Sequence, residues 1–266
     1  MSVLEVRSLS KAFGGVRAVS EVGFKVAQGE FLAMIGPNGA GKTTCFNIIN
    51  GQLPPDSGEI LLEGNDIAGL APREIWRLGV GRTFQVAATF GSMTVAENVQ
   101  MALISHAGEI LRLWRSAAAM HRERALDLLA QVGMREAADR PSRELAYGDI
   151  KRVELAIALA NEPRLLLMDE PTAGMGARER HELIALVKRL VVERKISVLF
   201  TEHSMDVVFA FADRIIVLAR GRLIADGAAA AIRDNAQVRE VYFGTGKTFV
   251  PGSASQLGSA SQGAAP

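Results

Sequence analysis

Hydrophobic and polar residues alternate along two stretches near the start of the chain, residues 3–9 and 18–26. A period of two is typical of β-strands with one buried face, so both stretches are expected to be strands. Residues 31–35 are apolar without interruption, which is typical of a strand buried on both faces. Further short runs that predict strands lie at residues 59–62, 80–84, 165–168, 197–200 and 215–218.

Between these strands the pattern predicts helices, at residues 42–50, 94–132, 149–160, 178–193 and 205–211. Thr94 precedes an apolar run and Glu97 follows three positions later, which is the signature of a capped helix start. Strands that alternate with helices indicate a parallel sheet with helical crossovers. The pattern therefore predicts an α/β fold with a mostly parallel sheet.

The composition indicates that the chain divides into two parts. The 266 residues are 48% hydrophobic and 22% charged, so the chain can bury a substantial core. Residues 1–244 are expected to form one compact unit with a mostly helical insertion at about 90–160. Residues 245–266 are rich in Gly, Ser, Ala and Gln and carry one charge, Lys247. We expect this tail to be disordered, because it offers little apolar surface to bury.

Charge and cysteine content narrow the possible partners. The 30 Lys and Arg nearly balance the 29 Asp and Glu, whereas binding to a phosphate backbone needs a surplus of clustered cations. Nucleic acid is therefore not an expected partner. The single cysteine, Cys45, excludes an internal disulfide framework and is expected to fill the core. No apolar run reaches the roughly 18 residues of a membrane span, and no signal-peptide pattern opens the chain, so we expect a soluble intracellular protein.

Residues 36–44 form a complete G-x-x-x-x-G-K-[ST] pattern between a predicted strand and a predicted helix. Its glycines let backbone N–H groups approach phosphate oxygens, and the helix N-terminus adds the positive end of its dipole. Lys42 is expected to reach the β- and γ-phosphates of a nucleotide, and Thr43 to hold Mg²⁺ through its hydroxyl. The predicted nucleotide-binding residues of this loop are Gly36, Pro37, Asn38, Gly39, Ala40, Gly41, Lys42, Thr43 and Thr44.

Two acids end the apolar run at residues 165–168. Asp169 is expected to complete the Mg²⁺ shell, and Glu170 to polarise the water that attacks the γ-phosphate. Paired acids also occur where a strand simply ends at solvent. The phosphate loop earlier in the chain favours the catalytic interpretation.

Over about residues 3–244 these motifs resemble the ATP-binding subunit of ABC transporters. The resemblance implies a P-loop NTPase core with a mostly parallel sheet, an N-terminal antiparallel β subdomain and a helical insertion. It also implies ATP hydrolysis, with ATP and Mg²⁺ as cofactors and Lys42 among the catalytic residues.

Three further residues take roles from this resemblance. Gln85 resembles the Q-loop glutamine, which contacts Mg²⁺ and senses the γ-phosphate. His203 resembles the switch histidine. Phe13, which lies beside Gly14 and outside the alternating stretch, resembles the aromatic residue that stacks on adenine. Considered alone, Phe13 would more often be a core residue and His203 a loop histidine.

Residues 145–149 occupy the place of the family's L-S-G-G-Q signature. The resemblance implies that three of them bind the γ-phosphate held by a partner subunit, namely Ala146, Tyr147 and Gly148. Asp149 replaces the usual glutamine, either as a helix-capping acid or as a negative charge near that phosphate. Gly176 stands where the family's D-loop has Asp or Asn, a departure that bears on coupling between the two ATP sites.

Residues 79–85, 93–99 and 232–244 resemble, more narrowly, the branched-chain amino-acid and urea/amide uptake branch. This resemblance implies an importer ATPase that is a homodimer or a heterodimer with a paralogue. It would be peripheral on the cytoplasmic face of the inner membrane, with permease subunits as direct partners and an external solute-binding protein as an indirect one. A weakly hydrolysing regulatory subunit is the alternative. A soluble ABC ATPase of translation or DNA repair is disfavoured, because the chain has neither a second nucleotide unit nor a long coiled-coil insertion.

Overall fold

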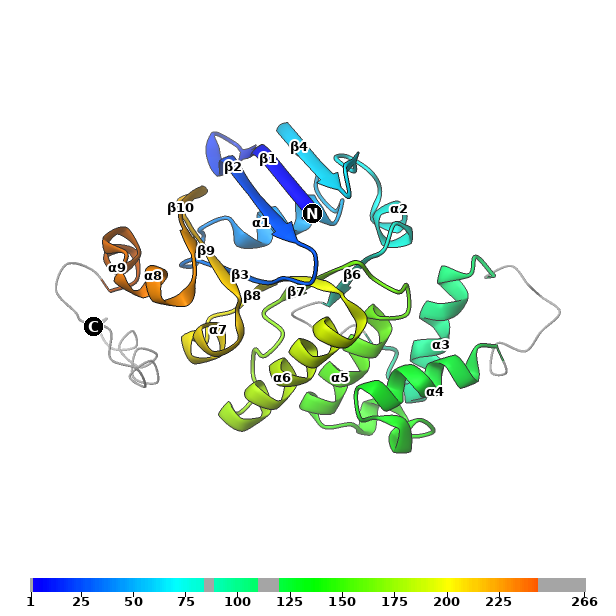
Figure 1. Cartoon of the computed structure of the whole chain (residues 1–266). Helices are drawn as coiled ribbons and strands as arrows, with labels where there is room; N and C mark the ends of the chain where they lie inside the picture. Colours follow the sequence, from blue (N-terminus) through cyan, green and yellow to red (C-terminus); the bar gives the residue numbers. More distant parts are fainter. Residues whose placement is uncertain (1, 84–88, 110–119, 244–266) are drawn as a thin grey trace, which may run out of the picture.

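The computed structural model describes residues 2–83, 89–109 and 120–243. They form two β-sheets with helices around them (Figure 1). The first sheet is antiparallel and has the strand order β2-β1-β4-β5, which confirms the expected N-terminal antiparallel subdomain. Its strands are β1 (Ser2–Phe13), β2 (Val16–Ala27), β4 (Ser57–Leu62) and β5 (Asn65–Asp66).

The hairpin between β1 and β2 corrects one expectation. Phe13 pairs with Val16, so it is the last residue of β1 and does not lie outside the strand. The turn consists of Gly14 and Gly15, whose φ angles of 51° and 90° suit a two-residue type I′ turn. Because this turn is so tight, both strands continue to the tip of the hairpin.

The second sheet has six strands in the order β10-β9-β3-β8-β7-β6. Five of them run parallel, and β10 pairs antiparallel with β9 at one edge. The expected mostly parallel sheet is therefore confirmed. Its strands are β3 (Phe31–Ile35), β6 (Val80–Thr83), β7 (Leu165–Asp169), β8 (Ser197–Thr201), β9 (Arg214–Ala219) and β10 (Arg222–Gly227).

The two faces of this sheet border different hydrophobic clusters. On β3, Leu32 and Met34 belong to the cluster shared with α1 and the antiparallel sheet. Phe31, Ala33 and Ile35 belong to the cluster shared with the helices of the other face. Every position of β3 is thus buried on one side or the other, which explains the uninterrupted apolar run.

Helices cover both faces of the parallel sheet (Figure 1). On the side of the antiparallel sheet lie α1 (Lys42–Ile49) and α2 (Pro72–Arg77). On the other side lie α3 (Val95–His106), α4 (Arg122–Gln131), α5 (Tyr147–Ala158), α6 (Ala177–Arg194) and α7 (Met205–Phe211). The 3-10 helices η2 (Arg135–Ala137) and η3 (Ser142–Glu144) lie between α4 and α5.

Within the described residues of the predicted helical stretch 94–132 lie two helices, α3 and α4. Its start is capped as predicted: Thr94 Oγ1 accepts the Glu97 N–H at 3.2 Å, and a Glu97 carboxylate oxygen accepts the Thr94 N–H at 2.7 Å. Within the parts of the chain that the structure describes, every helix falls short of the length and apolarity needed to cross a bilayer.

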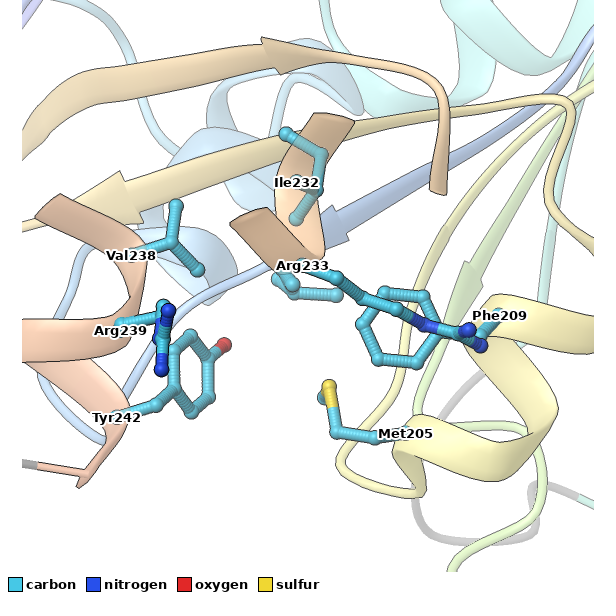
Figure 2. Close-up of a pocket in the computed structure, with 8 residues that line it drawn as sticks. Met205, Phe209, Ile232, Arg233, Val238, Arg239 and Tyr242 are labelled. Atoms are coloured by element: carbon cyan, nitrogen blue, oxygen red, sulfur yellow. The ribbon is translucent and has the colours of Figure 1, made fainter. Parts of the chain in front are cut away.

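Two short C-terminal helices, α8 (Ala229–Asp234) and α9 (Ala236–Phe243), pack beside α7 and the end of β3. The Arg233 guanidinium lies 4.3 Å from the ring centroid of Phe209, across the pocket in Figure 2. Burial raises the pKa of the Tyr242 phenol, and the nearby Gly36 backbone acts in the opposite direction. The C-terminal helices therefore reach the first residue of the loop that follows β3. The pocket is lined by Ile35, Met205, Phe209, Ile232, Arg233, Val238, Arg239 and Tyr242.

Candidate functional site

The loop of residues 36–44 connects β3 to α1 and places Lys42 at the first position of the helix. The Lys42 ammonium is buried and donates to the carbonyl oxygens of Gly36 at 2.7 Å and Pro37 at 3.2 Å. Burial lowers the pKa of Lys42, while the nearby carboxylates of Glu170 and Asp169 oppose this shift. The cation of the loop therefore faces the two acids at the end of β7. Next to Lys42, Thr43 is exposed in the first turn of α1.

The glycines of this loop are required by close backbone contacts. A Cβ atom on Gly41 would lie 2.3 Å from the carbonyl oxygen of Ala18, and Gly41 has a φ of 103°. A Cβ atom on Gly36 would lie 2.3 Å from the carbonyl oxygen of Leu218. The loop is thus held between β2 and β9 at distances that only glycine permits.

The ends of β7 and β8 bring the predicted acids into a hydrogen-bonded group. The strands pair so that Asp169 is opposite Thr201. The Thr201 hydroxyl donates to Asp169 Oδ1 at 2.7 Å and accepts the Glu170 N–H at 3.0 Å. One hydroxyl therefore fixes both the Asp169 carboxylate and the backbone of Glu170.

Glu170 and His203 contact each other directly. Glu170 Oε1 lies 2.7 Å from His203 Nε2, although the two residues are on loops that follow different strands. Glu170 has a φ of 48°, a left-handed conformation that costs a non-glycine residue about 1–2 kcal/mol. The fold thus stores strain at the residue predicted to act on water, as is common at functional sites.

Sequence reasoning missed three residues of this site. Thr201 and Glu202 are polar residues that directly follow the predicted strand 197–200. The same pattern identified the acids after β7, so a signal for this pair was present. Arg82 is the third: its buried guanidinium donates to Asn47 Oδ1 at 2.9 Å and lies 3.8 Å from Asp169 Oδ2. Burial lowers the pKa of Arg82, and the charge of Asp169 opposes that shift.

Phe13 lies at the tip of the β1–β2 hairpin and is 49% exposed. The Lys11 ammonium is 5.8 Å from the ring centroid, and Asp56 holds that ammonium through a 2.7 Å ion pair. A half-exposed ring of this kind offers a face for stacking. Gln85 lies outside the described residues.

The signature-like segment packs against the loop that follows β7. Tyr147 begins α5 after Ala146, which has no polar side chain to cap the helix. A Cβ atom on Gly174 would lie 3.5 Å from Tyr147 Cε1, and one on Gly148 would lie 3.5 Å from Met175 Cε. Because α5 and α1 pack on opposite faces of the sheet, this segment belongs to a different face from the phosphate loop.

The glycine loop at a helix N-terminus, with acids at the end of a neighbouring parallel strand, defines the class of P-loop nucleotide-binding proteins. A family model described as "ABC transporter" matches residues 19–173. The chain belongs to the family of ABC transporter ATP-binding subunits. A second model, described as "Branched-chain amino acid ATP-binding cassette transporter", matches residues 222–248, the region that contains β10, α8 and α9.

Relatives of similar length are named as branched-chain amino acid transport ATP-binding proteins. The chain is 40% identical over 249 residues to the high-affinity branched-chain amino acid transport ATP-binding protein BraF of Pseudomonas aeruginosa, which covers 91% of this chain and 98% of BraF. It is 37% identical to the corresponding protein LivG of Escherichia coli K12, with the same coverage. It is 36% identical to a probable LivG of Archaeoglobus fulgidus, over 92% of this chain and 96% of that protein.

Solved structures agree with this assignment. A nucleotide-free ATP-binding cassette of an ABC transporter superimposes with a TM-score of 0.82 at 30% identity, covering 92% of this chain and all of that one. A dimeric cassette bound to ADP and phosphate superimposes with a TM-score of 0.73 at 28% identity, covering 85% of this chain and 98% of that one. The comparison confirms the P-loop NTPase fold.

Proposed function

We propose that this subunit hydrolyses ATP to power the uptake of branched-chain amino acids, or related small polar solutes, through a membrane permease. The observation that carries the proposal is the 2.7 Å contact between Glu170 Oε1 and His203 Nε2 at the end of β7. Lys42 and Asp169 lie beside this contact. A cation, a carboxylate and a candidate water-orienting acid therefore converge at the carboxyl ends of the parallel strands.

The oxygen ligands at these strand ends fit a Mg²⁺–nucleotide complex. Mg²⁺ is usually held by one or two protein oxygens together with phosphate oxygens. The exposed hydroxyl of Thr43 and the fixed carboxylate of Asp169 are ligands of this kind, and Gln85 would join them from outside the described residues. When bound, the metal would neutralise charge on the phosphates.

The chain's own residues would supply positioning and proton transfer. The Lys42 ammonium would neutralise the β- and γ-phosphates from the start of α1, and the loop N–H groups would hold their oxygens. Glu170 would orient the attacking water and accept its proton, while His203 fixes the Glu170 carboxylate and contacts the γ-phosphate. Phe13 would stack on the adenine.

Two subunits would complete each site. Residues 145–149 lie on a different face of the sheet from the phosphate loop, so a second ATPase subunit would present its own Ala146, Tyr147 and Gly148 to the γ-phosphate. A pair in which each subunit presents the same surface to the other is isologous and two-fold symmetric. ATP would then close the dimer, and loss of the γ-phosphate would release it.

The transport role rests on the relatives named above. In this proposal the helical insertion at about 90–160 and the segment that contains Gln85 transmit dimer closure to permease subunits. The subunit would be peripheral on the cytoplasmic face of the inner membrane, and an external solute-binding protein would deliver the solute. Asp149 and Gly176 favour one alternative, a weakly hydrolysing regulatory subunit. Urea or amide uptake is the other.

The decisive variant is Glu170→Gln. It keeps the side-chain volume but removes the base, so ATP affinity should stay near wild type while kcat falls about 100- to 10,000-fold. The measurements are ATP titration of the full-length chain and ATPase activity of the chain reconstituted with its permease in vesicles.

Glu182→Gln is the matched control, because Glu182 forms an exposed ion pair with Arg178 on α6. An unchanged kcat in Glu170→Gln would remove Glu170 from the proposed role. A wild-type complex that binds ATP but does not hydrolyse it would favour the regulatory alternative.

A further inference from the structure

A buried carboxylate joins the two loops that carry the reacting side chains. Glu202, at the end of β8, is 3% exposed. Its Oε1 accepts both the N–H of Thr172, at 3.0 Å, and the hydroxyl of that residue. Its Oε2 accepts the N–H of His203 at 3.1 Å and of Ser204 at 3.4 Å. Each oxygen therefore serves a different loop.

The first of these loops follows the strained residue Glu170. Strained backbone persists only where the surroundings fix it on several sides. On one side the Glu170 N–H donates to the Thr201 hydroxyl, and on the other the Thr172 N–H donates to Glu202. Thr201, the last residue of β8, and Glu202, which follows it, thus hold the backbone on both sides of Glu170.

The second loop begins at His203, whose imidazole contacts Glu170. Because Glu202 binds the His203 N–H, it fixes the backbone that positions this imidazole. We propose that Glu202 is a positioning residue, which holds Glu170 and His203 in the relative positions that the hydrolytic step needs. This inference rests on the proposed ATPase function.

A neutral amide does not replace this carboxylate. A carboxylate accepts hydrogen bonds at both oxygens, whereas glutamine has one acceptor oxygen and one NH₂ donor. In Glu202→Gln the NH₂ group would face N–H donors of one loop, so that loop loses its attachment. Side-chain volume stays the same, which separates the effect from a packing defect.

The test compares variants of the full-length chain reconstituted with its permease. Glu202→Gln should lower kcat about 10- to 100-fold, because small displacements of reacting groups have effects of that size. KM for ATP should stay within about twofold, since the lost interaction acts after binding. Thr172→Val should lower kcat by a smaller factor, and Thr172→Ser, which keeps the hydroxyl, should restore it.

Glu30→Gln is the matched control. Glu30 is a largely buried carboxylate that forms a 2.7 Å ion pair with Arg214. Glu30 directly precedes β3, so it lies at the opposite end of the parallel strands from Glu202. Glu30→Gln should lower the free energy of unfolding without changing kcat. A folded Glu202→Gln variant with wild-type kcat would overturn the proposal, and so would a loss of kcat matched by an equal loss in Glu30→Gln.

Amide hydrogen exchange of the isolated full-length chain gives a readout that does not need ATPase activity. Glu202→Gln should speed exchange in the peptide of the loop that loses its attachment, either residues 170–174 or residues 203–206, and leave residues 36–44 unchanged. Unchanged exchange in both peptides would overturn the linkage between the loops. A wild-type complex without ATPase activity would instead refute the proposed function, while the exchange result would still decide the linkage.

Discussion

The phosphate loop and the strand-end group at β7 and β8 hold their shape by different means. The loop depends on backbone: Gly36 and Gly41 approach carbonyl oxygens so closely that a Cβ atom has no room. The strand-end group depends on side chains: Thr201 binds Asp169 and Glu170 from positions 32 and 31 residues away. One region is sensitive to added atoms, and the other to lost hydrogen-bonding atoms.

This difference predicts opposite responses to substitution. In the loop, removing a side chain should matter little except at Lys42 and Thr43, whereas adding one methyl group to a glycine should be severe. At the strand ends, the loss of a single hydroxyl or carboxylate oxygen should slow hydrolysis while ATP still binds. The following variants test the contrast.

Gly41→Ala should have the largest effect. The added Cβ would lie 2.3 Å from the Ala18 carbonyl oxygen, at a φ of 103°. Backbone strain and overpacking together should lower the free energy of unfolding by about 3 kcal/mol and abolish ATP binding. Chemical denaturation and ATP titration measure the two effects.

Gly39→Ala is the control within the same loop. Gly39 has a φ of 78°, but a Cβ atom there would meet nothing within 4 Å. Only the strain remains, so the loss of stability should be about 1–2 kcal/mol. Equal effects of the two alanine variants would contradict the role assigned to the close contact with β2.

Thr201→Val should have the next largest effect. Valine matches the shape of threonine, but the variant loses both the donor to Asp169 and the acceptor of the Glu170 N–H. We expect kcat to fall about 10- to 100-fold, and the free energy of unfolding to fall by about 1–3 kcal/mol. Thr201→Ser keeps the hydroxyl and should retain most of the activity. If valine and serine behave alike, the hydroxyl does not orient the acids.

The sequence predicts the fold where the signal is local and long enough. The apolar runs of β3, β7, β8 and β9 identify buried strands because each strand is covered on both faces. The two-residue strand β5 and the six-residue helices α2 and α8 were not predicted, because such short segments contain too little periodicity. Phe13 was misplaced because the glycine turn after it extends the hairpin.

The candidate site, too, is predicted from the sequence only where its signal is local. The phosphate loop is a contiguous motif, so its residues can be read directly from the sequence. The roles of Thr201 and Glu202 depend on the register between β7 and β8, which pairs Asp169 with Thr201. Register is a long-range property, and a pattern within one strand does not specify it. The contact between Glu170 and His203 was not predicted for the same reason, because the two residues follow different strands.

Cys45 gives the smallest expected effect and tests whether the helix after the phosphate loop is as rigid as its packing indicates. Its thiol is fully buried, and burial raises its pKa to about 12, compared with about 8.5 in an unfolded chain. Between these values the unfolded chain binds fewer protons, so stability should fall as pH rises from about 9 towards 12. At pH 8 the native thiol should stay unlabelled by alkylating reagents, with ATPase activity unchanged, and should react fully in guanidinium chloride. Rapid labelling of the native chain with loss of ATPase activity would show that α1 opens and that the loop is not held as rigidly as its glycine contacts imply.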